Sequence, residues 1–114
     1  MTEPSELLKG IADPTRLRIV ALLARARREL CVCQIQGALG ESQHKVSRHL
    51  KVLRFAGWVR EERRGKWVHY ELAEPDSAFH ESLIAALSRL YLQYLSLSVP
   101  LEEIDSLMKQ NPCG

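Results

Sequence analysis

Residues 42–56 read SQHKVSRHLKVLRFA, and their pattern is the strongest indication of the fold in this sequence. Ser42 is a favoured helix N-cap, and the apolar residues after it recur at steps of four, three and three, the period of a helix with one buried face. These apolar positions are Val46, Leu50, Leu53 and Ala56. The opposite face is polar and basic. The sequence therefore predicts an exposed cationic helix from Gln43 to Ala56, ended by Gly57.

A shorter helix precedes the cationic one. Residues 29–39 (ELCVCQIQGAL) are typical of a brief connection and a short helix, which Gly40 ends. Further upstream, Asp13 is a suitable cap and Pro14 suits the first turn of a helix that ends near residue 27. Two short helices joined by a Gly-containing turn form a helix-turn-helix.

The residues after Gly57 predict a β-hairpin. Residues 58–63 (WVREER) and 66–72 (KWVHYEL) are strand-like runs around a turn at Arg64-Gly65. A hairpin directly after a helix-turn-helix is a wing. The predicted fold class is therefore mainly α with a β-hairpin wing, a winged helix-turn-helix.

From Pro75 onward the sequence predicts a long amphipathic helix. Its apolar residues are spaced four, three and four apart, a seam suited to packing against a second helix. The seam consists of Leu83, Leu87, Leu90 and Tyr94. An isolated helix would expose this stripe, so we expect a homodimer. An N-terminal apolar patch is expected beside the seam, formed by Leu7, Leu8 and Ile11.

The composition is that of one globular domain, with 114 residues, 46% hydrophobic and 26% charged. No apolar run approaches the roughly 18 residues of a membrane span, and the N-terminus lacks the layout of a signal peptide. We therefore expect a cytoplasmic protein with no membrane partner. Residues 1–98 are expected to form the winged helix-turn-helix and dimerisation domain, and residues 99–114 a mobile C-terminal tail.

The net charge of +2 is unevenly distributed. Residues 42–66 hold eight Lys and Arg against two Glu, so this segment carries +6 and the rest of the chain −4. Such segregation is the footprint that a polyanion partner such as DNA requires. A solvated basic face is the alternative, but the order of helix, turn, cationic helix and cationic hairpin favours DNA.

The candidate DNA-binding residues lie on the exposed face of the cationic helix and at the wing tip. Such side chains donate to phosphate, and Gln, Lys, Arg and Ser also read base edges. The wing cations can grip flanking phosphate or enter a minor groove. The candidates are Ser42, Gln43, His44, Lys45, Ser47, Arg48 and His49 on the helix, and Arg63, Arg64 and Lys66 on the wing.

Four motifs in this order resemble the ArsR/SmtB family of metal-responsive repressors, in its arsenic-responsive branch. They are DPTRLRI at 13–19, ELCVC at 29–33, SQHKVSRHL at 42–50 and GKWVHY at 65–70. The resemblance covers the chain up to about Tyr94. It implies a homodimeric transcriptional repressor on double-stranded operator DNA. It also implies release of the DNA when arsenite or antimonite supplies a trivalent ion that cysteine thiolates bind.

Cys31 and Cys33 supply two thiolates for such an ion. In a regular helix, residues two apart point about 200° apart, so both sulfurs meet one ion only where the first turn is frayed or distorted. Ion binding and DNA release are expected to be linked there. The related repressors have a third cysteine three residues after the second, where this chain has Gln36. Cys113, from the same or the partner subunit, an external thiol or water would fill the third position.

Other interpretations remain open for these residues. The helix cysteines are alternatively small buried hydrophobes, or sensors of thiol redox state in a winged-helix repressor. An enzyme is disfavoured, because the sequence has no phosphate-cradling Gly-rich loop and no spacing that would activate a thiol. The histidines do not match the zinc pattern of the family. We expect His44 and His49 to face DNA, and His80 to lie on the surface.

Overall fold

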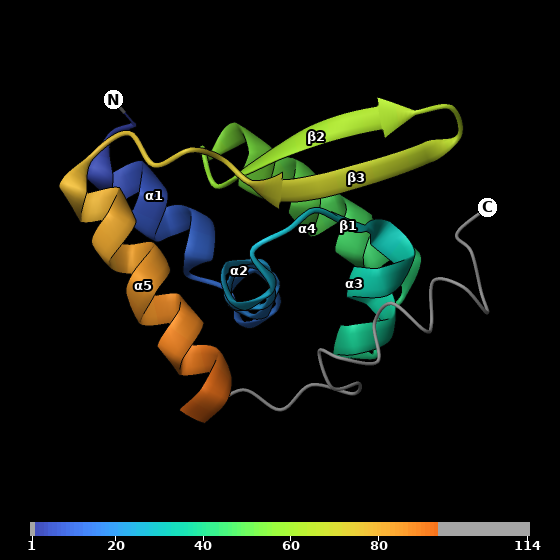
Figure 1. The fold of residues 1–114 in the computed structure, drawn as a ribbon, viewed down its shortest axis with the longest axis horizontal. Coiled ribbons are helices and arrows are strands. Elements are labelled where there is room, and N and C mark those ends of the chain that lie inside the picture. Colours follow the sequence, from blue (N-terminus) through green and yellow to red (C-terminus); the bar gives the residue numbers. More distant parts are fainter. Residues whose placement is uncertain (1, 94–114) are drawn as a thin grey trace.

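The structure is a computed structural model that describes residues 2–93. Within them, five helices pack together and a β-hairpin lies along one side of them, which confirms the predicted winged helix-turn-helix (Figure 1). In chain order the elements are α1 (Pro4–Ile11), α2 (Pro14–Ala26), β1 (Leu30–Cys31), α3 (Val32–Leu39), α4 (Gln43–Phe55), β2 (Val59–Arg64), β3 (Trp67–Leu72) and α5 (Ala78–Gln93). No helix in the described part of the chain is long and apolar enough to cross a membrane.

The capping residues fix the helix boundaries as predicted. The Asp13 carboxylate accepts the N–H of Arg16 at 3.0 Å and starts α2. The Ser42 hydroxyl accepts the N–H of Lys45 at 3.2 Å and starts α4. Gly40, with φ of 68°, ends α3 in the left-handed conformation that glycine tolerates best.

The core is built around α2. Figure 1 shows α2 end-on at the centre, with α1 and α5 to one side, α3 to the other and the hairpin across the top. Residues 19–23 of α2 are all at most 1% exposed, because neighbours cover this helix on several sides. Burying one such aliphatic side chain contributes about 1.5–3 kcal/mol. The position of α4 and the hairpin therefore depends on α2.

The hairpin, residues 59–72, is the wing, and it differs from the prediction in two ways. A third strand, β1, pairs antiparallel with β3 through Leu30 opposite Tyr70 and Cys31 opposite His69. β1 was not predicted, because a strand of two residues carries no periodic signal. The turn is also one residue later than expected, since Arg64 pairs with Trp67 and Gly65 takes φ of 63°. A glycine at the first position of a two-residue loop allows this backbone conformation.

Leu87, in the middle of the seam predicted for a partner helix, packs instead against the same chain, which corrects the expectation for that residue. Leu87 is only 5% exposed, and Leu83 and Leu90 are partly buried, because α5 packs along α2. Tyr94 lies outside the described residues. Of the N-terminal patch, Leu7 belongs to the core. The exposed large apolar side chains of α1 and α5 are Leu8, Phe79 and Leu92.

His80 is buried, and the expectation of a surface residue was wrong. The Ser77 hydroxyl accepts the N–H of His80 at 3.1 Å, so the histidine lies in the first turn of α5 on the core side. Its ring meets the Trp58 ring edge-on, with 5.1 Å between the centroids. The indole N–H of Trp58 in turn donates to the Leu7 carbonyl at 2.8 Å. This contact chain joins α5, the residue just before the wing and α1.

Candidate DNA-binding face and cysteine pair

The exposed face of α4 carries six of the seven helix residues proposed to contact DNA. Ser42 at its cap and Gln43, His44 and Arg48 along it are exposed, and Lys45 and Ser47 are partly exposed. Lys45 also pairs with Glu41, with 3.3 Å between Nζ and Oε2. Two further cations of α4 within the predicted basic segment, Lys51 and Arg54, are also exposed.

His49 does not lie on this face, so its proposed contact with DNA is corrected. It is 9% exposed, because it follows Val46 by three residues and shares the core side of the helix. Its Nδ1 lies 3.4 Å from Nη1 of Arg16 and 3.9 Å from Oδ2 of Asp13. Desolvation lowers the pKa of His49 against the opposing pull of Asp13. The side chain therefore packs α4 against the start of α2.

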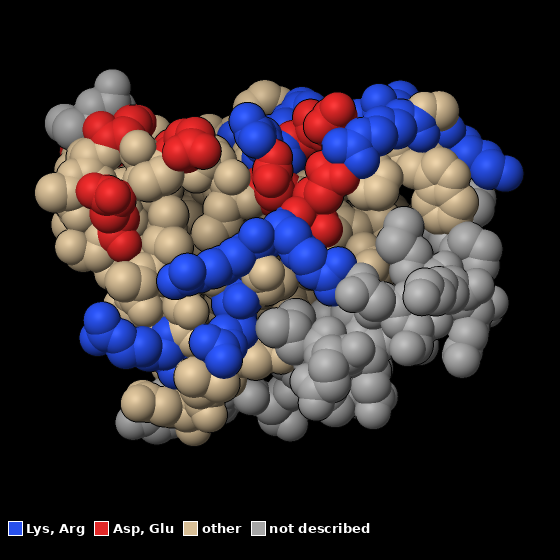
Figure 2. Space-filling view, viewed as in Figure 1, with Lys and Arg blue, Asp and Glu red and all other residues tan. Residues whose placement is uncertain are grey.

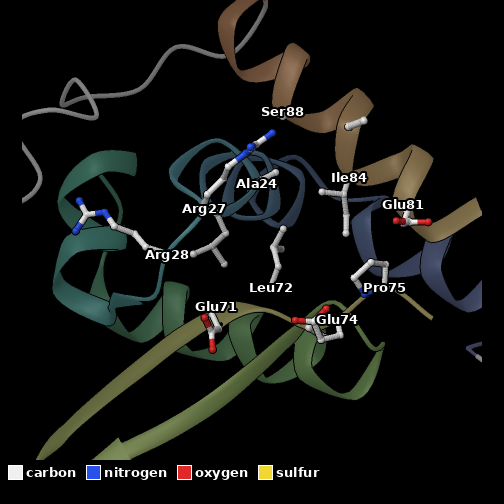
Figure 3. A pocket seen from close by; sticks show the side chains of 13 residues that line it. Ala24, Arg27, Arg28, Glu71, Leu72, Glu74, Pro75, Glu81, Ile84 and Ser88 are labelled. Carbon is white, nitrogen blue, oxygen red and sulfur yellow. The ribbon is translucent and has the colours of Figure 1, made fainter. Parts of the chain in front are cut away.

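The wing cations differ in their surroundings. In Figure 2, Lys and Arg side chains cover the distal part of the hairpin, and Asp and Glu gather nearer the body of the protein. Arg64 contacts two of these acids, with Nη2 2.9 Å from Glu29 and 3.2 Å from Glu62. Arg63 and Lys66 are exposed and form no ion pair within residues 2–93. They are therefore the uncompensated cations of the wing.

The hairpin register places Arg63 on the side of α4. Glu61, two residues before Arg63 and on the same face, forms an ion pair with Arg54 of α4. Glu61 also accepts a hydrogen bond from the Tyr70 hydroxyl at 3.0 Å. Burial raises the pKa of Tyr70 to about 12, so the hydroxyl keeps its proton. Arg54, Glu61 and Tyr70 thus hold this face of the wing beside the cationic helix.

The cysteine pair lies at a junction and not within a regular helix. Cys31 is the last residue of β1 and the N-cap of α3, with φ −82° and ψ 164°, and it is 1% exposed. Cys33 lies in the first turn of α3 and is partly exposed. The expected 200° separation of two helical side chains therefore does not apply, because the pairing of β1 keeps Cys31 extended.

Cys31 also takes part in starting α3. Its backbone N–H donates to the Gln34 side chain at 2.8 Å, and its own side chain faces the Gln34 backbone N–H. This reciprocal arrangement is a capping box in which cysteine occupies the usual place of Ser or Thr. A ligand that draws the sulfur away would remove this contact from the start of α3.

A complete three-ligand site is not formed by the described residues. Within residues 2–93 no group of three or more His, Cys, Asp or Glu side chains is placed to hold a metal ion. Gln36 is partly exposed, and Cys113 lies outside the described residues. Cys33 is disulfide-bonded in the structure. Once it is reduced, the thiolates of Cys31 and Cys33 suit a thiophilic ion, with the third position open to another donor.

A helix-turn-helix beside a cationic hairpin defines a winged helix-turn-helix DNA-binding protein. Residues 13–61 match the arsR family of bacterial regulatory proteins. The chain is 47% identical over 81 residues to the arsenical resistance operon repressor of Escherichia coli, covering 71% of this chain and 68% of that protein. It is 43% identical over 88 residues to the arsenic resistance transcriptional regulator ArsR2 of Pseudomonas putida, covering 76% of each.

A solved structure agrees with this assignment. The homodimeric winged helix-turn-helix DNA-binding domain Mb0332 of Mycobacterium bovis matches with a TM-score of 0.63 and 28% identity, covering 82% of each chain. The chain belongs to the ArsR family of transcriptional repressors. Its relatives are DNA-binding regulators and not enzymes.

Proposed function

We propose that this repressor leaves its operator when trivalent arsenic or antimony binds Cys31 and Cys33. One observation carries the proposal: Cys31 ends β1 and caps α3, the first helix of the helix-turn-helix. An ion that binds the sulfurs of both Cys31 and Cys33 would remove the Cys31 sulfur from the capping box. The first turn of α3 would then change. The relatives in Escherichia coli and Pseudomonas putida are named for arsenic resistance, which supports this choice of ion.

The chemistry of the ion fits a thiolate pair. Trivalent arsenic and antimony are soft and prefer sulfur ligands, whereas the amide of Gln36 is a poor donor for them. The third position is left to Cys113, an external thiol or water. Thiolate ligands must lose their protons on binding, so affinity for the ion falls as the pH is lowered.

The DNA complex is proposed as a homodimer on two half-sites. Two α4 helices related by a two-fold axis would read an imperfect inverted repeat, with half-sites about one helical turn or a multiple of it apart. The exposed face of α4 would contact bases and phosphates, and Arg63 and Lys66 would contact flanking phosphate. The homodimeric state of Mb0332 supports this arrangement.

The ion must supply a large free-energy difference. Moving an operator from almost fully occupied to almost fully free takes a preference of about 10⁴ for the released state, or roughly 5.5 kcal/mol. The difference must come from tighter ion binding by the DNA-free form. We assign this free-energy difference to the junction between β1 and α3, which has to rearrange before the two sulfurs can bind one ion.

The deciding experiment measures DNA affinity with and without arsenite for wild type, Cys31→Ser and Cys33→Ser. Each serine variant should bind DNA nearly as well as wild type but lose the response, because the hydroxyl is a poor ligand for a soft ion. Cys113→Ser should be partial or silent. Gln36→Cys, which adds a third sulfur, should lower the arsenite concentration needed for release.

Two outcomes would change this conclusion. If both single variants still release DNA at the wild-type arsenite concentration, Cys31 and Cys33 are packing residues. If peroxide releases the wild-type protein and arsenite does not, the cysteines sense thiol redox state instead.

A further inference from the structure

Cys31 and the wing share one sheet. The strand order is β1-β3-β2, and Cys31 of β1 lies opposite His69 of β3. The same β3 forms the wing with β2, down to Trp67 opposite Arg64. Cys31 is therefore separated by a single strand from β2, whose end carries the wing cations.

Glu29, immediately before β1, makes a second connection to the wing. Both guanidinium nitrogens Nη1 and Nη2 of Arg64 donate to its carboxylate, the latter at 2.9 Å from Oε2. The Glu29 side chain is 28% exposed and that of Arg64 is 51% exposed. A two-pronged Arg–carboxylate pair fixes geometry as well as charge. Here it joins residues 35 positions apart in the sequence.

The other acid beside Arg64 does not connect elements. Glu62 lies 3.2 Å from Nη2 of Arg64, but it stands two residues earlier on the same strand. Of the two acids that contact Arg64 in the described part of the chain, only Glu29 belongs to another segment of the fold. Arg64 therefore contacts two carboxylates of equal charge. Glu29 links β2 to the segment before β1, and Glu62 is a local contact within β2.

We propose that Glu29 is the positioning residue through which the cysteine pair acts on the wing. When an ion draws the Cys31 sulfur toward Cys33, the junction between β1 and α3 must turn, and Glu29 lies two residues from Cys31. The Glu29 carboxylate then loses its bidentate contact with Arg64, and the hairpin loses an ion pair near its tip. This inference rests on the proposed function and adds a route to DNA release beside the change in α3.

The test compares Glu29→Gln with Glu62→Gln. Each substitution removes one negative charge beside Arg64, but only Glu29→Gln removes the ion pair that links the wing to the segment before β1. Affinity for a duplex selected from a random library is measured with and without saturating arsenite, and the ratio of the two affinities is the coupling. Glu29→Gln should reduce this ratio by about two- to fivefold, the effect of losing one part-exposed ion pair. Glu62→Gln should leave it unchanged. Equal ratios in the two variants overturn the inference.

A second measurement keeps this inference separate from the proposed function. If arsenite leaves wild-type affinity unchanged, the proposed function fails and Glu29 cannot transmit an ion signal. Its positioning of the wing is then decided without arsenite, by amide hydrogen exchange. Glu29→Gln should speed exchange across residues 63–68, and Glu62→Gln should not. Equal exchange in both variants overturns the positioning role itself.

Discussion

At the scale of single residues, His49 shows how a polar side chain of a DNA-binding helix serves packing. Its ring meets Arg16, whose Nε donates to the Gly10 carbonyl at 2.7 Å. It also lies near Asp13, the cap of α2. One imidazole thus joins α4 to the start of α2 and, through Arg16, to the end of α1.

The buried histidine predicts a pH dependence of stability. Desolvation lowers the pKa of His49 in the folded protein below its value of about 6.5 in the unfolded chain. As the pH falls below about 6.5, the unfolded chain binds the proton first, so stability is lost until the pH passes the folded pKa. Urea unfolding between pH 7 and pH 5 should show a smaller loss for His49→Gln than for wild type. A control replaces His44, which is exposed on the same helix; if it reduces the loss equally, His49 is not the responsible group.

At the scale of elements, α4 and the wing divide the contact with DNA. Arg48 is exposed on α4, where a side chain can reach base edges in a major groove. Arg63 shares the α4 side of the hairpin and has no acidic partner within residues 2–93, whereas Arg64 is compensated by two acids. The helix is therefore expected to set sequence preference and the wing to add affinity.

The two wing arginines are predicted to differ when mutated. Arg63→Ala should weaken binding to all sequences and flatten the salt slope by about one unit, since it removes one phosphate contact. Arg64→Ala should change the slope less, because Glu29 and Glu62 already offset its charge. Affinities measured over a range of salt concentrations decide this, and equal slopes for Arg63→Ala and wild type would remove Arg63 from the interface.

Arg48→Ala is predicted to act on specificity. If the guanidinium reads a base edge, its loss should cost about 1–3 kcal/mol on the preferred sequence and relax the preference at one position. Competition between the selected duplex and single-base variants measures this. A uniform loss over all sequences would instead assign Arg48 to phosphate.

At the scale of the whole molecule, α2 supports every other part. Leu22 is fully buried in the cluster that joins α2 to the helices and the hairpin. Leu22→Ala should cost about 2–5 kcal/mol of unfolding free energy, the range for a deep cavity in a packed core. Thermal or urea unfolding checks this, with Phe55→Ala on the exposed face of α4 as the control that should cost much less. Similar losses in both would show that the core packs less tightly at Leu22.

The homodimer is also a property of the whole molecule. Exposed Leu8, Phe79 and Leu92 on α1 and α5 are the apolar side chains expected at its interface. Sedimentation at micromolar concentration should give a dimer, and Leu92→Glu should shift it toward monomer. Phe55→Ser is the matched control, since Phe55 is 82% exposed but lies on α4. A wild-type monomer under these conditions contradicts the dimer.

Elements whose signals are local could be predicted from the residues alone. The Ser42 cap, the spacing of Val46, Leu50 and Leu53, and the glycine of the hairpin each act within a few residues, so the helix-turn-helix and the wing were predictable. The four motifs between residues 13 and 70 predicted the family to which the chain belongs.

The surface that each polar side chain meets depends on packing between distant elements. β1 exists because β3 pairs with it, and this pairing makes Cys31 an extended cap and not a helical residue. His49 is buried because α4 docks on the start of α2. Arg64 is compensated by Glu29, 35 residues away. Such contacts depend on how elements pack across the fold, and no local pattern of residues encodes them.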